Sequence, residues 1–388
     1  MSTSGSFIAS KLRFKGRLAV ISIAVSFLVI VLSLAISSGF RKEIRGGVSS
    51  LTGDIQLTSP SSNNYSSDVF INADPSFMEE ILARKGVEAV TPAIYRAGII
   101  QNGEDLQGVL FKAVPSNDSI PLQISIPRSL ARTLRIAEGD QVRGYFVGER
   151  VQVRKFTVRS IYEGLTDNSG SPMVLASYED IRRVNGWDEG KASALEITLS
   201  DRFRERGAQK QKAVELAGFA YGRAEDEDDP TLAVAAADKY FNLFDWLDLI
   251  DFNVLVILIL MVLVAGFNMI SGLLIFLFRN ISTIGTLKAL GMGDRGIAGV
   301  FLRVSAKAVL KGMLLGNALA LLFCLVQGLT HFIRLNPDNY FISYVPVSVN
   351  WLQILAVDAV AFAAIMLLLL IPSLFIARVD PADTVRVK

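Results

Sequence analysis

Residues 252–278, with the sequence FNVLVILILMVLVAGFNMISGLLIFLF, decide the class of this protein. The segment has 27 residues without a charged side chain, bracketed by Asp251 and Arg279. A helix of roughly 20 residues crosses the hydrocarbon core of a bilayer, which is about 30 Å thick. The segment is therefore long enough to span a membrane, and it predicts an integral membrane protein.

Three other segments have the same character, at residues 18–36, 303–329 and 351–376. The first is longer than the 7–15-residue apolar core of a signal peptide, so we expect it to remain as an uncleaved anchor. The fourth contains Asp358, whose carboxylate costs about 2.5–3.5 kcal/mol near the bilayer centre, and its role stays open. The expected fold class is an α-helical membrane protein with four transmembrane helices (1+3) and a large α+β extracytoplasmic domain between helices 1 and 2.

Basic residues cluster beside the ends of these spans. They precede the first span, fill the connection between the second and third, and follow the fourth: Lys11, Arg13, Lys15 and Arg17; Arg279, Lys288, Arg295, Arg303, Lys307 and Lys311; Arg378, Arg386 and Lys388. Because basic residues near span ends resist translocation, these regions should be cytoplasmic. The expected cytoplasmic segments are residues 1–17, 279–302 and 377–388, and the expected outer segments are 37–251 and 330–350.

The outer segment alternates between strand-like and helix-like patterns. We expect strands at 54–59, 87–101, 105–114, 142–147, 151–162, 173–176 and 195–199, and short helices at 75–85, 127–134 and 202–216. This predicts a mixed α+β domain, which could comprise two subdomains. Helix one should continue beyond the bilayer until Gly46-Gly47 or Gly53, and a second long helix should run from Asp238 to Arg279.

The sequence offers little catalytic chemistry. It contains one cysteine, Cys324, and one histidine, His331, so neither an intrachain disulfide nor a multi-histidine metal site can form. The nearest approach to a phosphate-binding loop is Gly186–Ala192, but its spacing is one residue short and it lacks the final hydroxyl. We therefore expect no catalytic residues, no metal and no cofactor bound by this chain.

The connection after Arg279 predicts a short helix with an apolar stripe, at Ile281, Ile284, Leu287 and Leu290. Gly291 and Gly293 should end this helix, and Asp294 should cap the next one. Such a helix could rest on the membrane surface, or it could dock into a groove on a partner protein. Composition alone slightly favours the membrane surface.

This connection also carries a resemblance to a known family. The stretch Ile284-Gly285-Thr286-Leu287-Lys288-Ala289-Leu290-Gly291 resembles the "IGxLKALG" signature of FtsX-like permeases, the MacB-type ABC transporter superfamily. Residues 377–386 are similar to the family's closing "DPAxxLR" pattern. Residues 38–44, 126–142 and 156–164 resemble segments of its lipoprotein-releasing permeases, the LolC/LolE type. Arg279 and Thr283 depart from the residues common in that family.

The resemblance implies the permease of an ABC transporter in the bacterial inner membrane, with its large domain in the periplasm. Residues 284–291 would contact a separate ATPase that holds ATP-Mg. Phe27, Val31, Met261, Phe267 and Met269 could line the substrate path, or each could simply contact lipid or a neighbouring helix. The implied partners are that ATPase, a second permease copy or paralogue, a lipoprotein substrate, a periplasmic carrier and membrane lipids, without nucleic acid. Two alternatives stay open: a MacB- or FtsX-like export or mechanotransmitting permease, and a non-transport scaffold or sensor.

Overall fold

The computed structural model describes residues 17–61, 69–116, 120–148, 150–163, 171–336 and 342–373. Residues 1–16 and 374–388, which hold most of the predicted cytoplasmic tails and the closing 377–386 pattern, lie outside this range. The described chain forms two compact units. The helical unit contains the chain up to Arg41, Asp248–Ile333 and the chain from Val345 onward. The strand-rich unit contains Lys42–Leu247 and Arg334–Tyr344.

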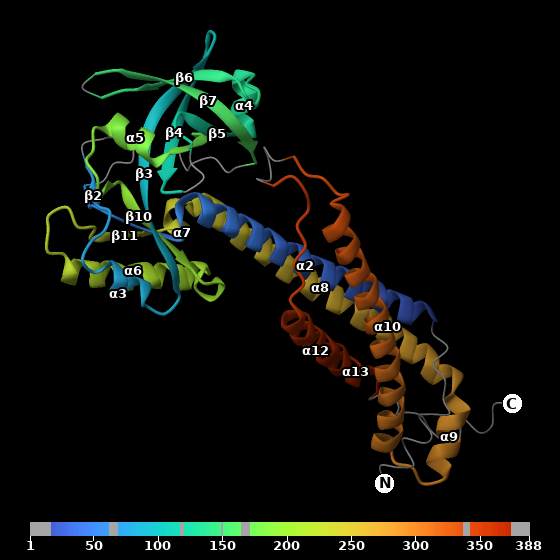
Figure 1. The fold of residues 1–388 in the computed structure, drawn as a ribbon. Coiled ribbons are helices and arrows are strands. Elements are labelled where there is room, and N and C mark those ends of the chain that lie inside the picture. Colours follow the sequence, from blue (N-terminus) through green and yellow to red (C-terminus); the bar gives the residue numbers. More distant parts are fainter. Residues whose placement is uncertain are drawn as a thin grey trace. The chain divides into compact units, whose positions relative to one another are not determined.

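Four helices in the described chain are long and apolar enough to cross a membrane. They are α2 (Arg17–Thr52), α8 (Phe241–Arg279), α10 (Asp294–Thr330) and the pair α12 (Trp351–Leu368) and α13 (Leu370–Ser373). A short helix, α9 (Ile281–Ala289), connects α8 to α10 (Figure 1). Within the described residues, the four apolar segments found in the sequence are therefore helical, apart from a turn at Leu369.

The helices extend past the predicted spans, and some expected boundaries are wrong. Of the two stops expected for the first helix, the one at Gly53 is confirmed: α2 passes through Gly46-Gly47 and ends at Thr52, before Gly53 with its left-handed φ of 68°. The expected continuous helix from Asp238 is instead broken at Tyr240, which separates α7 (Ala236–Lys239) from α8. Gly293 rather than Asp294 is the N-cap of α10, so the predicted segment 279–302 holds α9 and the first turns of α10.

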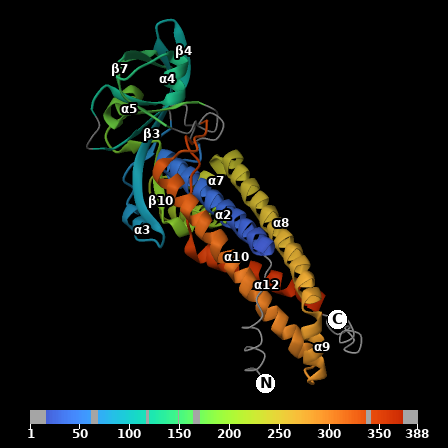
Figure 2. The ribbon, with the colours of Figure 1, turned by 90° about the vertical axis from the view of Figure 1, so that its right-hand side faces the viewer.

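Close packing between α2 and α10 depends on two glycines one turn apart in α10. A Cβ added at Gly312 would lie 2.7 Å from Cγ2 of Ile23, and one at Gly316 would lie 2.9 Å from Cβ of Phe27 and overlap the Ala24 carbonyl oxygen. Small residues at this spacing let two helix backbones approach each other in a membrane. Figures 1 and 2 both show α2 beside α8 and α10.

A polar contact joins α10 to α12. Asn317 Nδ2 donates a hydrogen bond to Asp358 Oδ2 over 2.6 Å, and the Asp358 side chain is almost fully buried. The carboxyl group that interrupts the fourth apolar segment therefore faces a neighbouring helix of the same unit. Such interhelical hydrogen bonds are a recurrent means of association between apolar helices.

The strand-rich unit is built on a nine-stranded sheet with the order β11-β1-β10-β3-β4-β8-β5-β7-β6. Long β3 also pairs with β6, so the strands from β3 to β6 close on themselves. The pairs β4–β8 and β5–β7 are parallel, and the other pairs are antiparallel. The strands are β1 (Ile55–Thr58), β2 (Ile71–Asn72), β3 (Val87–Asn102), β4 (Asp105–Val114), β5 (Gln123–Pro127), β6 (Gln141–Phe146), β7 (Gln152–Tyr162), β8 (Met173–Ser177), β9 (Lys191–Ala192), β10 (Ala194–Leu199) and β11 (Leu232–Ala235).

Three apolar clusters support this sheet: one contains residues from the end of α2 and from α7, and the other two are separate cores that pack short helices against the strands. Phe111, Phe146 and Phe156 are fully buried in the closed part, beside α4 (Arg128–Leu134) and α5 (Tyr178–Asn185). The other core packs β1 and β10 against α3 (Met78–Leu82) and α6 (Arg206–Arg223) (Figure 1). The expected mixed α+β composition is confirmed, and the two cores fit the suggested pair of subdomains.

Candidate functional site

Helix α9, predicted to couple the permease to a partner, ends in a Schellman motif. Gly291 has a φ of 86°, and its N–H donates to the Lys288 carbonyl over 2.9 Å. The next N–H, of Met292, donates to the Leu287 carbonyl over 3.0 Å. This pair of bonds satisfies carbonyls that the helix end leaves open, and it requires a residue that tolerates positive φ. The predicted stop at Gly291 is confirmed.

The predicted apolar stripe of α9 does not face one direction. Ile284 is buried, and Leu287 packs against the same cluster, which includes Ile297 of α10. Leu290, by contrast, is 79% exposed. The Lys288 Nζ forms an ion pair with Asp294 Oδ1 over 2.9 Å, which ties the end of α9 to the start of α10.

The outward surface of α9 is small and uncharged, comprising Ser282, Thr283, Thr286, Ala289, Leu290 and Gly291. The apolar side chains that usually anchor a helix in a groove pack inside this chain, apart from Leu290, so a partner would contact a neutral surface with one exposed leucine. Within the predicted segment, Ile284, Gly285 and Lys288 therefore support the helix, whereas Thr286, Ala289 and Leu290 are accessible to a partner.

The residues predicted to line a substrate path fall into different environments. Phe27 and Met269 are buried in the main helical cluster, and Val31 is buried in a second cluster with Ala320 and Ile354. Phe267 is 61% exposed, and Met261 is half-buried. Of the five side chains, only Met261 and Phe267 offer surface in this chain.

The sequence did not reveal an apolar groove between α8 and α12. Its volume is about 700 Å³, and its walls are leucine, isoleucine, valine and alanine side chains, including Leu255, Ile259, Val360 and Leu367. These four side chains are exposed. Alanines at 356, 361 and 364 leave room for the groove and are the sequence feature that could have indicated it.

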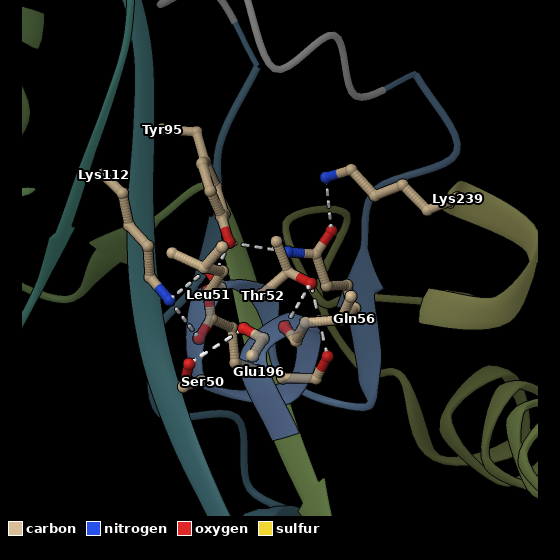
Figure 3. A network of polar contacts seen from close by, with 11 residues as sticks. Ser50, Leu51, Thr52, Gln56, Tyr95, Lys112, Glu196 and Lys239 are labelled. Carbon is tan, nitrogen blue, oxygen red and sulfur yellow. Dashed lines mark hydrogen bonds and ion pairs between the residues drawn. The ribbon is translucent and has the colours of Figure 1, made fainter. Parts of the chain in front are cut away.

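A buried polar network lies where the end of α2 meets the sheet of the strand-rich unit (Figure 3). Lys112 Nζ donates to the Leu51 carbonyl of α2 over 2.5 Å, and it lies 2.8 Å from Glu196 Oε2. Both charged side chains are more than 90% buried. The cation therefore satisfies a carbonyl at the C-terminal end of α2, where a positive charge is favourable.

The same network continues to α7, directly before α8. The Tyr95 hydroxyl donates to Glu196 Oε1 and accepts a hydrogen bond from Gln56 Nε2 over 2.7 Å, and Lys239 Nζ donates to Gln56 Oε1 over 3.0 Å. Burial, and secondly the Glu196 charge, raise the pKa of Tyr95 well above its ordinary value. The phenol therefore stays protonated and donating at neutral pH. One polar cluster thus fixes the end of α2 and the helix preceding α8 to the same sheet.

The rejected sites have simple structural positions. Gly186 is the left-handed C-cap of α5, and the segment to Ala192 leads from this helix into β9. A phosphate-binding loop has the opposite order, strand then helix. His331 is the C-cap of α10. Among the described residues, no group of His, Cys, Asp and Glu side chains could hold a metal ion.

Comparisons with known proteins agree with this architecture. Residues 255–381 match the family described as FtsX-like permease C-terminal. The "Lipoprotein-releasing system transmembrane protein LolC" of Xylella fastidiosa is 22% identical, with 95% of this chain and 92% of that protein aligned. LolC of Neisseria meningitidis is 22% identical over 94% of this chain, and LolE of Haemophilus influenzae is 20% identical over 94%. Each of those alignments covers 92% of the relative.

Solved structures with some similarity cover only part of the chain. The extracellular domain of the transporter YknZ from Gram-positive bacteria aligns with 44% of this chain and 96% of its own, at 13% identity and a TM-score of 0.29. The periplasmic region of MacB from Actinobacillus actinomycetemcomitans aligns with 49% and 91%, at 13% identity and a TM-score of 0.31. The chain is therefore similar to FtsX-like permeases in the matched C-terminal domain, and to LolC and LolE proteins along nearly its whole length.

Proposed function

We propose that this permease belongs to an ATP-driven transporter that extracts lipoproteins from the bacterial inner membrane and passes them to a periplasmic carrier. The observation that carries the proposal is the alignment of 94–95% of the chain with lipoprotein-releasing LolC and LolE proteins. That alignment includes both the membrane helices and the strand-rich unit. A relative sharing only the membrane part would support no more than a general permease.

The proposed orientation follows from charge. Arg17 begins α2, Arg279 ends α8, and Arg295 lies in the first turn of α10. Since basic residues near span ends stay on the cytoplasmic side, α9 would face the cytoplasm and the strand-rich unit the periplasm. A separate ATPase, carrying ATP-Mg, would then bind the exposed surface of α9.

The movement would reach the periplasm through two long helices. At 1.5 Å per residue, the 36 residues of α2 and the 39 residues of α8 extend roughly 54 and 58 Å, well beyond a hydrocarbon core of about 30 Å. The Lys112–Glu196 network holds the end of α2 and the helix before α8 on one sheet. Displacement of α9 would therefore move the strand-rich unit as a whole.

The need for ATP follows from the substrate. Each acyl CH₂ group buried in the membrane contributes about 0.8 kcal/mol, so extraction of two or three chains costs tens of kcal/mol unless another apolar site receives them. Exposed apolar side chains of α8, including Phe267, could contact these chains between helices one and two of a permease pair. The second permease would be a copy of this chain or a paralogue.

Reconstitution tests this function. The permease, its second copy or paralogue and the ATPase are placed in liposomes with a labelled lipoprotein, and transfer to an added soluble carrier is measured. We expect release that requires both ATP and carrier, and that stops when the ATPase cannot hydrolyse ATP. ATP hydrolysis without release under any condition would contradict lipoprotein extraction and favour mechanical signalling instead.

A further inference from the structure

A second groove lies between the first turns of α2 and the last turns of α8, within the helical unit. Its volume is about 630 Å³. Two guanidinium groups line it, Arg17 from α2 and Arg279 from α8, and no acidic side chain is among its lining residues. No ion pair joins either arginine to another residue in the described part of the chain. The groove therefore has a net positive charge to offer a ligand.

Arg17, Arg279 and Ser22 give the groove hydrogen-bond donors, whereas the Ser271 hydroxyl donates to the Phe267 carbonyl over 3.1 Å and Asn268 Oδ1 is an acceptor. Ser22 Oγ accepts a hydrogen bond from Asn268 Nδ2 over 2.5 Å, which leaves the Ser22 proton free to donate. The guanidinium groups have only donors. A ligand suited to Arg17, Arg279 and Ser22 must therefore present several acceptor oxygens and a negative charge, as a phosphate group does.

The remaining walls are apolar. Leu18 is 83% exposed and Ile275 is 56% exposed, and both line the groove beside the arginines. A soluble anion would leave these side chains unused. A molecule with an anionic head and hydrocarbon tails would match both parts of the surface, since basic pockets between membrane helices bind anionic lipid headgroups.

We propose that this groove binds the headgroup of an anionic phospholipid from the leaflet in which α2 begins and α8 ends. The phosphate would lie between Arg17 and Arg279, and the acyl chains would run along Leu18 and Ile275. Such a lipid joins the two helices at the ends next to α9. The inference rests on the membrane placement of α2 and α8 proposed above, but not on the identity of the transported cargo.

Lipid binding to the delipidated full-length permease tests this site. Affinity for phosphatidylglycerol and for phosphatidylcholine is measured by native mass spectrometry on wild type and on Arg17→Gln/Arg279→Gln. We expect wild type to prefer phosphatidylglycerol, and the double variant to bind it roughly 25-fold more weakly, about fivefold for each arginine. The variant Arg17→Lys/Arg279→Lys, which keeps both charges, should retain most of the binding.

The matched control is Arg303→Gln/Lys307→Gln, which removes two exposed cations of α10 that do not line the groove. It should leave phosphatidylglycerol affinity within about twofold. An equal loss in this control would show diffuse attraction to the surface and would overturn the site. Unchanged binding in Arg17→Gln/Arg279→Gln would overturn it as well, as would binding of soluble glycerol phosphate as tight as that of the lipid.

Two checks keep the outcomes separate. Each variant must elute as wild type does in size-exclusion chromatography, and if Arg17→Gln/Arg279→Gln does not, the single Arg279→Gln variant takes its place with an expected fivefold loss. The binding assay uses no ATPase, carrier or lipoprotein. Loss of lipid selectivity would therefore contradict this site alone, whereas absence of ATP-driven release would contradict the proposed function alone.

Discussion

Lys112 brings a positive charge into the interior of the strand-rich unit, where it contacts a helix end and a carboxylate. The ammonium group bonds to the Leu51 carbonyl and pairs with Glu196, and both charged side chains are more than 90% buried. Lys112 lies on the same face of β4 as the fully buried Leu110. A charged residue at a core position of an alternating strand is the sequence signal that could have pointed to this network.

Substitution of Lys112 by Met should strongly destabilise the protein. The apolar chain is nearly retained, but Glu196 becomes a buried carboxylate without its cation, which typically costs about 3–5 kcal/mol. The check is thermal unfolding of the purified full-length protein in detergent. Arg128→Met is the control, because Arg128 and Glu163 form an ion pair with both side chains about half exposed. Loss of that pair should cost less than about 1 kcal/mol. Similar melting temperatures for Lys112→Met and Arg128→Met would contradict the assigned role of Lys112.

At the scale of elements, the contact of α2 with α10 depends on the absence of side chains in α10. A methyl group at Gly316 would overlap the Ala24 carbonyl oxygen, which belongs to a helix backbone and cannot move alone. Gly316→Ala should therefore separate the helices and lower the free energy of unfolding by about 1–3 kcal/mol through the clash. The higher helix propensity of alanine should offset roughly 1 kcal/mol of this loss. The melting temperature of the purified protein checks the result.

Gly299→Ala provides the matched comparison. Gly299 also lies in α10, but an added Cβ there meets nothing within 4 Å. Gly299→Ala should gain the higher helix propensity of alanine without a steric clash. The melting temperature of this variant should therefore equal or exceed that of wild type. If Gly316→Ala were as stable as Gly299→Ala, close contact between α2 and α10 would not describe the protein.

Regular elements were predictable where a pattern was long or unambiguous. β4 was predicted with the bounds observed, Asp105–Val114, because its apolar run Val109–Phe111 lies in a short segment between Gly103 and Pro115. Helix α5, Tyr178–Asn185, was missed, since its buried apolar side chains are only Ile181 and Val184 among many charges. β5 was missed because it has only five residues and its last, Pro127, was assigned to the following helix.

The candidate site was predictable only where it is formed by residues that are neighbours in the sequence. Helix α9 and its end at Gly291 follow from neighbouring residues, and the structure has both. The grooves arise from contacts of α8 with α2 and with α12, and the buried network joins residues between Leu51 and Lys239. No local pattern encodes those pairings. The exposure of Leu290 also escaped prediction, because a three-residue spacing drifts around a helix of 3.6 residues per turn.

At the scale of the whole molecule, the proposed transport requires force delivered by another protein. In the proposed function, a separate ATPase delivers energy through an exposed surface of this chain, and we assign that role to α9. Two continuous helices, α2 and α8, then lead from the helical unit into the strand-rich unit. Movement of α2, α8 and the strand-rich unit in this proposal requires that a partner ATPase binds α9.

The most direct test is therefore a copurification. The permease, as wild type or Leu290→Glu, is co-expressed with the partner ATPase and purified, and the amount of ATPase that is recovered with it is measured. Leu290 is 79% exposed, so a glutamate at this position should not disturb folding. When the ATPase binds α9, however, the new carboxylate would be buried at the interface. We predict at least roughly tenfold less ATPase than with wild type, as expected for an interface hot spot of about 2 kcal/mol or more. Leu106→Glu, at a 60% exposed leucine of the strand-rich unit, should leave recovery unchanged. Equal ATPase recovery with Leu290→Glu and wild type would contradict the account.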